Sequence, residues 1–194
     1  RIALGLKGLD YEYVAVDLKT RAHKAADYVA RNPQGLLPTL EVDGVALTQS
    51  AAIIEWLEET FPTPPLLPRD PILRARARGI AAIVASDIAP LHSMRVSLAV
   101  RNEFGRGEEG LRAWVHRFAE AGLGAIEAIM TELPGPYACG EAPSVADIYL
   151  VAMLHTATSA GVDFARLPRI AAATALAQEH PAFAAAHSSK QPDK

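Results

Sequence analysis

Cysteine, net charge and long apolar runs are all scarce in this sequence. Cys139 is the single cysteine among 194 residues, so no internal disulfide can form, and this is typical of a reducing compartment. No apolar run approaches the roughly 18 residues that cross a bilayer. The formal net charge of −3 gives no electrostatic reason to expect nucleic acid. These absences predict a cytoplasmic protein that binds neither membranes nor nucleic acid.

Metal and nucleotide sites are not indicated either. The glycines form no pattern that would cradle a phosphate. Cys139 lies in a loop between Gly135 and Gly140, where a small buried hydrophobic side chain is the favoured interpretation. Paired spacing of metal ligands is missing among the six histidines, which are His23, His92, His116, His155, His180 and His187.

The chain changes character after about sixty residues. Half of all residues are hydrophobic, which is enough for a substantial core in one large or two small domains. Residues 62–71 contain five prolines and predict a stiff extended linker. We therefore expect a mixed α/β domain over residues 1–61, the linker over 62–71 and an all-α domain over 72–194.

Helical and strand patterns alternate in the first domain. Gly8 is typical of the residue that follows a helix end, and Asp43-Gly44 is a strong hairpin signal. Ser50 is placed to cap a helix that continues to Glu59. The pattern also predicts helices over 2–7 and 22–31 and strands over 11–16, 39–42 and 45–47.

The second domain has helical spacing throughout and predicts a bundle of antiparallel helices. Pro90 predicts a kink near residues 87–89 of the first helix. Ser144 followed by Asp147 predicts a capping box, so Asp147 has a structural role and no catalytic one. The expected helices cover residues 72–102, 108–133, 144–160 and 169–187.

A candidate binding site lies where the first predicted hairpin meets a loop and a helix. Pro38 stands at a strand entrance, where regular pairing stops. A cis peptide bond between Leu37 and Pro38 would leave the N–H and C=O of Leu37 free for a ligand. The helix that begins at Ser50 would add backbone donors and a positive dipole end. Together these groups suit a small peptide-like anion.

This order of parts resembles a glutathione transferase of the zeta class, which includes maleylacetoacetate isomerases and bacterial maleylpyruvate isomerases. The resemblance implies an α+β fold, with a truncated thioredoxin-like N-terminal domain that lacks its first strand and an all-α helical C-terminal domain. It also implies glutathione as the cofactor and a homodimer. The segments that carry it are Arg1–Gly8, Gln49–Glu59, Pro62–Pro68, Ala142–Asp147 and Gln191–Asp193.

The resemblance assigns the glutathione contacts to the first domain. Leu37, next to Pro38, would pair through its main chain with the cysteinyl unit, and Gln49 and Ser50 would hold the γ-glutamyl carboxylate. His23 corresponds to a polar position that reaches the glycyl end. The alternatives are a plain helix cap for Ser50 and an exposed helix histidine for His23.

Two further residues come from the first long helix of the second domain. Arg95 could hold a substrate carboxylate, because its planar fork matches that group bidentately, or it could be a solvated helix arginine. His92 could contact glutathione or be a satisfied core histidine. The isomerases usually have an amide pair where His92-Ser93 stands and an arginine where Ser159 stands. These departures favour the alternative of a glutathione transferase or peroxidase that acts on apolar electrophiles.

No catalytic residue can be assigned, because the family's thiol-activating serine run is expected upstream of Arg1. The resemblance implies isomerisation of a small unsaturated diacid by thiolate addition, rotation and elimination. The alternatives are a general glutathione transferase or peroxidase acting on apolar electrophiles, and a non-catalytic binding module of the same fold.

Overall fold

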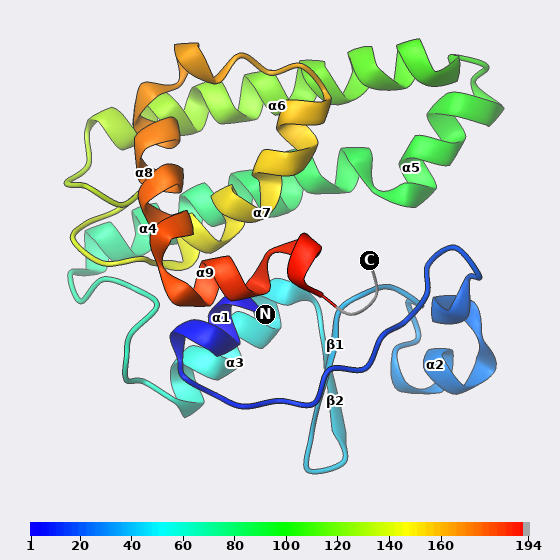
Figure 1. Ribbon diagram of the computed structural model, residues 1–194, viewed down its shortest axis with the longest axis horizontal. Helices are drawn as coiled ribbons and strands as arrows, with labels where there is room; N and C mark the ends of the chain where they lie inside the picture. Colours follow the sequence, from blue (N-terminus) through cyan, green and yellow to red (C-terminus); the bar gives the residue numbers. More distant parts are fainter. Residues whose placement is uncertain (192–194) are drawn as a thin grey trace. The chain divides into compact units, whose positions relative to one another are not determined.

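The computed structural model describes residues 1–191, except for the side chain of Ser188, and divides into two compact units. Unit 1 contains Arg1–Pro65 and the segment from Ala182 onward, and unit 2 contains Leu66–Pro181 (Figure 1). The division falls inside the proline-rich segment, between Pro65 and Leu66. The linker boundaries at 61/62 and 71/72 stay predictions.

Unit 1 begins with the short helix α1 (Ile2–Leu6). Gly8 follows it with a φ of 65°, a left-handed conformation that glycine adopts without steric cost. The N–H of Gly8 donates to the carbonyl of Gly5 at 3.1 Å, and that of Leu9 donates to Leu4 at 3.0 Å. These bonds satisfy carbonyls at the helix end, as the sequence predicts.

The predicted strand at 11–16 is wrong, since this segment has no strand pairing in the structure. β-branched and aromatic residues fit a pleated, half-buried surface, but they form a strand only where a neighbouring strand accepts their hydrogen bonds. Val14 is exposed. Within residues 1–191, the single sheet consists of β1 (Thr39–Val42) and β2 (Val45–Thr48).

The predicted hairpin is confirmed. β1 and β2 pair antiparallel from Val42↔Val45 to Thr39↔Thr48. Asp43 and Gly44 both have positive φ, 50° and 80°, which fits the type I′ turn that matches strand twist. Helix α3 (Ser50–Thr60) follows directly and buries Ile53, Ile54 and Leu57 on one face.

The predicted helix over 22–31 is broken into two pieces. A 3₁₀ turn, η1 (Ala22–Lys24), is separated from α2 (Ala26–Arg31) by Ala25, whose backbone is extended at φ −66° and ψ 149°. Helix spacing alone cannot detect such a break, because the residues on either side keep the same periodicity.

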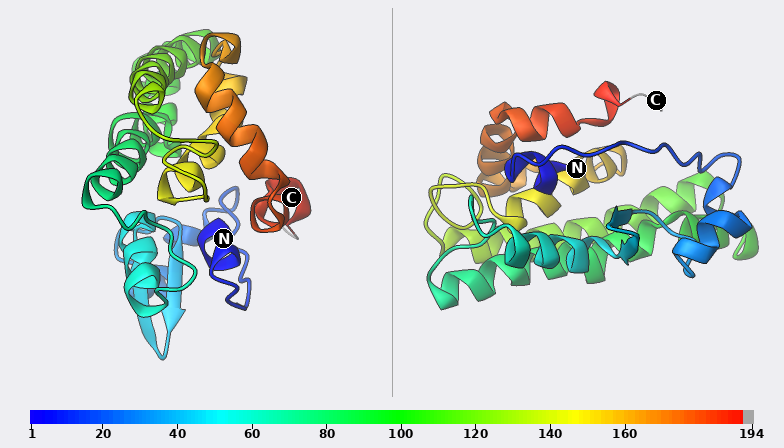
Figure 2. Two further views of the ribbon diagram at one scale, coloured as in Figure 1. Left: turned by 90° about the vertical axis from the view of Figure 1, so that its left-hand side faces the viewer. Right: turned by 90° about the horizontal axis from the view of Figure 1, so that it is seen from below.

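Unit 1 also contains a segment from the far end of the chain. Helix α9 (Pro181–Ala186) lies beside α1, in red beside blue in Figures 1 and 2. A Cβ on Gly5 would come within 3.1 Å of the Cβ of Ala182, so the two helices approach closely at this glycine. A last 3₁₀ turn, η6 (Ser188–Lys190), follows.

Unit 2 is entirely helical apart from its connections and one isolated bridge between Tyr137 and Gly140. Helix α7 packs against α4, α6 and α8, and the bundle core includes Ile80, Ile126, Leu150 and Ile170. Its elements are α4 (Pro71–Ala82), η2 (Ile83–Ile88), η3 (Ala89–His92), α5 (Met94–Leu98), η4 (Ala99–Glu103), α6 (Gly107–Thr131), α7 (Val145–Ser159), η5 (Phe164–Arg166) and α8 (Pro168–Glu179).

Two of the predicted long helices are interrupted at prolines. The first changes from α4 to the π-helical turn η2 and the 3₁₀ turn η3 around Pro90, and Ser93 is extended at ψ 153°. Proline lacks an N–H and its ring crowds the preceding turn, so the helical ladder must change there. His180 is likewise extended, at ψ 132°, before Pro181 and separates α8 from α9.

Among the described residues, no helix is both long enough and apolar enough to span a membrane.

Candidate functional site

The hairpin register brings the predicted loop and helix start to one place. Thr39 and Thr48 form the last pair of the ladder. Leu37 lies two residues before Thr39, and Ser50 lies two residues after Thr48. Because the strands are antiparallel, both residues are beyond the same end of the hairpin. Leu37, Pro38, Gln49 and Ser50 are thereby brought together.

The main chain of Leu37 is open at this end. The Leu37–Pro38 peptide bond is cis, and the Leu37 residue is 43% exposed. Neither its N–H nor its C=O has a hydrogen-bond partner within residues 1–191. A donor and an acceptor on one residue can pair with the main chain of a short peptide, as an added strand does.

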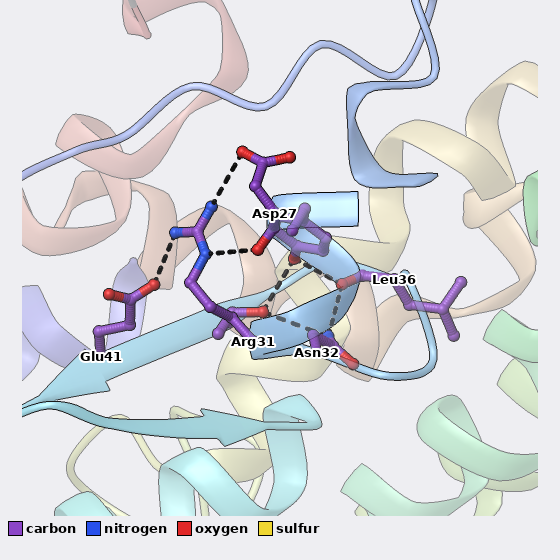
Figure 3. A network of polar contacts seen from close by, with 7 residues as sticks. Asp27, Arg31, Asn32, Leu36 and Glu41 are labelled. Atoms are coloured by element: carbon purple, nitrogen blue, oxygen red, sulfur yellow. Dashed lines mark hydrogen bonds and ion pairs between the residues drawn. The ribbon is translucent and has the colours of Figure 1, made fainter. Parts of the chain in front are cut away.

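A network of polar side chains surrounds the loop that carries Leu37 (Figure 3). The hydroxyl of Tyr28 and the Nδ2 of Asn32 both donate to the carbonyl of Leu36, each at 2.7 Å. The same two groups contact the hydroxyl of Thr39 at 2.8 and 3.2 Å. On the solvent-exposed surface of the same region, Arg31 donates a hydrogen bond to Glu41 at 2.7 Å.

Gln49 and Ser50 form the start of α3. Gln49 has a φ of 69° and a ψ of 119°, a sparsely populated conformation for a residue with a side chain. Its Nε2 donates to Oε1 of Gln34 at 2.6 Å, which links the helix start to the loop.

Ser50 is the first helical residue, so the cap position belongs to Gln49 and the predicted capping by Ser50 is wrong by one residue. The Ser50 hydroxyl has no hydrogen-bond partner in the described chain. The first N–H groups of an α-helix lack intrahelical partners and carry the positive end of the dipole. The hydroxyl and the helix N-terminus together provide hydrogen-bond donors of the kind that can hold a carboxylate.

His23 lies in η1 and is only 7% exposed, so the alternative of an exposed helix histidine is wrong. Its Nδ1 is buried without a partner among the described residues. The loop approaches it closely, since a Cβ on Gly35 would come within 2.8 Å of the His23 carbonyl. A buried nitrogen without a partner is costly unless a ligand or water satisfies it.

In unit 2, His92 ends η3 and Arg95 lies in α5. Trp114 donates to the carbonyl of Leu91 at 2.8 Å, and Ser97 donates to the carbonyl of His92 at 3.1 Å, so the turn is held in place. Burial lowers the pKa of His92, which favours the neutral ring. Its Nε2 is buried without a partner in the described part. Arg95 is exposed and forms no ion pair with described residues.

The two residues interpreted as structural behave as such. Asp147 is buried and accepts hydrogen bonds from the backbones of Ala138 and Ser144, both at 2.8 Å, within a complete capping box. Burial raises the pKa of the Cys139 thiol to about 11, with the charge of Asp147 adding to the effect. A protonated, buried thiol is a poor nucleophile. Ser159 is exposed at the end of α7.

Sequence reasoning missed Tyr28, Asn32 and Thr39 as parts of the site. The available signal was the position of these three hydrogen-bonding side chains on both sides of the proline-led loop. No group of three or more candidate metal ligands occurs in the described residues.

Comparisons with known proteins cover almost the whole chain. Residues 1–60 match the family described as Glutathione S-transferase, N-terminal domain, and residues 108–185 match Glutathione S-transferase, C-terminal domain. A maleylacetoacetate isomerase from Pseudomonas aeruginosa is 45% identical over 100% of this chain and 91% of its own length. A maleylpyruvate isomerase from a Ralstonia species is 44% identical over 100% and 92%.

Solved structures agree with these relatives. A holo structure of a maleyl pyruvate isomerase, described as a bacterial zeta-class glutathione S-transferase, has a TM-score of 0.96 and 42% identity and covers 100% of this chain and 92% of that one. A maleylacetoacetate isomerase from Anaeromyxobacter dehalogenans with bound GSH has a TM-score of 0.88 and 39% identity, over 99% and 89%.

Proposed function

Since this chain belongs to the glutathione transferase superfamily and, within it, to the zeta class, we propose that it is a glutathione-dependent isomerase of the maleylacetoacetate or maleylpyruvate type. The observation that carries this proposal is the cluster of unsatisfied polar groups beyond the hairpin end, at Leu37 and Ser50. It occurs in a chain that aligns over its full length with two isomerases.

The residues of unit 1 fit glutathione. The free N–H and C=O of Leu37, beside Pro38, would pair with the main chain of the cysteinyl unit. Ser50 and the N-terminus of α3, with Gln49, would hold the γ-glutamyl carboxylate. The buried Nδ1 of His23 would meet the glycyl end. Each of these groups has an unused hydrogen-bond donor or acceptor that matches one part of the tripeptide.

Bound glutathione supplies a thiol whose reversible addition to an activated double bond allows rotation before elimination. The chain's own contribution is to bind and orient. Arg95, with no ion pair to described residues, would hold one carboxylate of the diacid through its planar fork. His92, neutral and half-buried, would offer a hydrogen bond from its ring. The thiol-activating role has no assigned residue in residues 1–191.

The first prediction concerns Arg95. Arg95→Met is expected to raise the KM for the diacid about tenfold or more, because a charge-assisted bidentate contact contributes roughly 1.5–3 kcal/mol. The KM for glutathione should stay within about twofold. Initial rates of maleylacetoacetate and maleylpyruvate isomerisation, followed by absorbance at varied glutathione, give both constants. Arg112→Met, on an exposed part of α6, is the matched control.

A conjugation assay with an apolar electrophile decides between the isomerase and the general transferase. The exposed serine at position 159, where the resemblance implies an arginine, is the observation that favours the transferase. We expect isomerisation to be the faster reaction. Conjugation without isomerisation of either diacid would overturn the diacid assignment. If isomerisation does occur, an Arg95→Met variant that keeps the wild-type KM for the diacid would remove Arg95 from the substrate site.

A homodimer and a cytoplasmic location are also proposed, both from the family resemblance. A shallow apolar groove on α4, η2 and α6 of unit 2 is a surface of the kind that homodimers cover. It is lined by Ile72, Ala75, Arg76, Gly79, Ile80, Ile83 and Ile129. Sedimentation velocity of the purified protein measures the oligomeric state directly.

A further inference from the structure

We propose that Tyr28, Asn32 and Thr39 form a clamp that positions the main chain of Leu37 for glutathione. None of the three side chains hydrogen-bonds the open N–H or C=O of Leu37, so they act through the loop as positioning residues. This inference rests on the proposed function for its ligand. The geometry that supports it lies within unit 1 (Figure 3).

The clamp holds the peptide unit that contains the Leu37 N–H. The carbonyl of Leu36 accepts two hydrogen bonds at 2.7 Å, from the Tyr28 hydroxyl and from Asn32 Nδ2. Leu36 C=O and Leu37 N–H belong to one planar trans peptide, in which the two bonds point in opposite directions. Because the carbonyl is held toward the clamp, the N–H of Leu37 must point away from it.

The donors come from buried side chains. Asn32 is 2% exposed and Tyr28 is 4% exposed. Both lie in or directly after α2, with Tyr28 one helical turn before Asn32. Residues three to four apart on a helix lie on one face, which explains why both reach the same carbonyl oxygen.

Every polar side-chain atom of the clamp takes part in a hydrogen bond. The Tyr28 hydroxyl donates its single proton to Leu36, so it must accept from Thr39 Oγ1 at 2.8 Å. Asn32 donates one Nδ2 proton to Leu36 and the other to Thr39 at 3.2 Å, and its Oδ1 accepts from the backbone N–H of Gln34, also at 3.2 Å. A buried network that is fully satisfied specifies one geometry.

Thr39 connects the clamp to the other half of the site. It is the first residue of β1 and pairs with Thr48, two residues before Ser50. Tyr28 and Asn32 therefore hold the loop on both sides of Leu37–Pro38, at Leu36 and at Thr39. The clamp fixes the Leu37 main chain relative to the start of α3, which a bound tripeptide would have to span.

Three single variants test the clamp. Tyr28→Phe and Thr39→Val each remove one hydroxyl from the ring of hydrogen bonds, and Thr39→Ser keeps it. Thr48→Val is the matched control, because Thr48 is the ladder partner of Thr39 and its hydroxyl has no partner among the described residues. Thermal unfolding of each variant checks that the fold persists.

The first two variants are expected to weaken glutathione binding about three- to tenfold by titration calorimetry. The kcat of isomerisation at saturating glutathione should stay within about twofold. The double variant should bind no worse than about the weaker single variant, because both substitutions open the same ring. Thr39→Ser and Thr48→Val should bind like the wild type.

A readout without glutathione separates the clamp from the proposed function. In ¹⁵N relaxation measurements on the ligand-free protein, the order parameter of the Leu37 amide should fall in Tyr28→Phe and Thr39→Val and stay unchanged in Thr48→Val. If the wild type binds no glutathione, the proposed function fails while this readout still decides on the clamp. The clamp proposal would be overturned by an unchanged Leu37 order parameter in both Tyr28→Phe and Thr39→Val. A loss of affinity in Thr48→Val equal to that in these two variants would also overturn it.

Discussion

Replacing Lys7 by methionine is expected to lower the free energy of unfolding by about 3–5 kcal/mol, the cost of breaking a buried ion pair. The Lys7 side chain is fully buried, and its Nζ donates to Glu58 Oε2 at 2.6 Å. Its other two protons go to the carbonyls of Phe61 at 2.6 Å and Pro64 at 2.7 Å. All three donors of the ammonium are thus used.

The large effect follows from what the substitution leaves behind. Methionine removes the cation from beside the buried Glu58 and removes the donor from two carbonyls at the end of α3 and in the proline-rich segment. A buried charge that loses its ion-pair partner costs more than the intact pair contributes. Lys7 therefore fixes the end of α1 against the end of α3.

Urea unfolding followed by circular dichroism measures this prediction. The double variant Lys7→Met/Glu58→Leu is expected to recover part of the loss, because it removes the buried charge together with its partner. Lys19→Met, at an exposed position in a turn, is the control and should change stability by less than about 0.5 kcal/mol. If the Lys7→Met protein were as stable as the control, Lys7 would not stabilise the fold through its ion pair with Glu58.

Replacing Ser50 by alanine is expected to weaken glutathione binding by about 10- to 100-fold, since a hydrogen bond to a charged group contributes roughly 1.5–3 kcal/mol. The same substitution should leave the unfolding free energy within about 0.5 kcal/mol of the wild type. The hydroxyl has no partner in the described chain, so its removal leaves no internal group unsatisfied.

Titration calorimetry and urea unfolding of the same preparations test the two halves of this prediction. Ser50→Thr keeps the hydroxyl and should keep most of the affinity. The opposite pattern, with unchanged affinity and a loss of about 1 kcal/mol in stability, is the expected result for a plain helix cap. That pattern would show that Ser50 has a structural role and does not bind glutathione.

Several local sequence signals predicted the structure correctly, because the neighbouring residues alone determine the conformation there. Asp43-Gly44 specifies a tight turn because both residues tolerate positive φ. Gly8 after α1 and the box formed by Ser144 and Asp147 are likewise set within one helical turn. Leu37 and Ser50 could be placed together in advance for the same reason, since the hairpin register alone aligns them.

Features that depend on distant residues were not predictable. The segment 11–16 has the composition of a strand, but the composition of one segment does not show whether a second segment pairs with it. Nothing around Lys7 indicates that it is buried, because its partner Glu58 is fifty-one residues away. The clamp is not visible in the sequence, because Tyr28 and Asn32 meet Leu36 and Thr39 only after the loop has folded back on α2.

The close approach of α9 to α1 bears on how the molecule is made. Unit 1 is discontinuous in sequence, with all of unit 2 inserted between its two parts. During synthesis on the ribosome, the half that carries Leu37 and Ser50 emerges first, yet Gly5 meets Ala182 only after unit 2 has been translated. The part of unit 1 that carries Leu37 and Ser50 therefore gains its contacts with α9 only after the helical unit has been made.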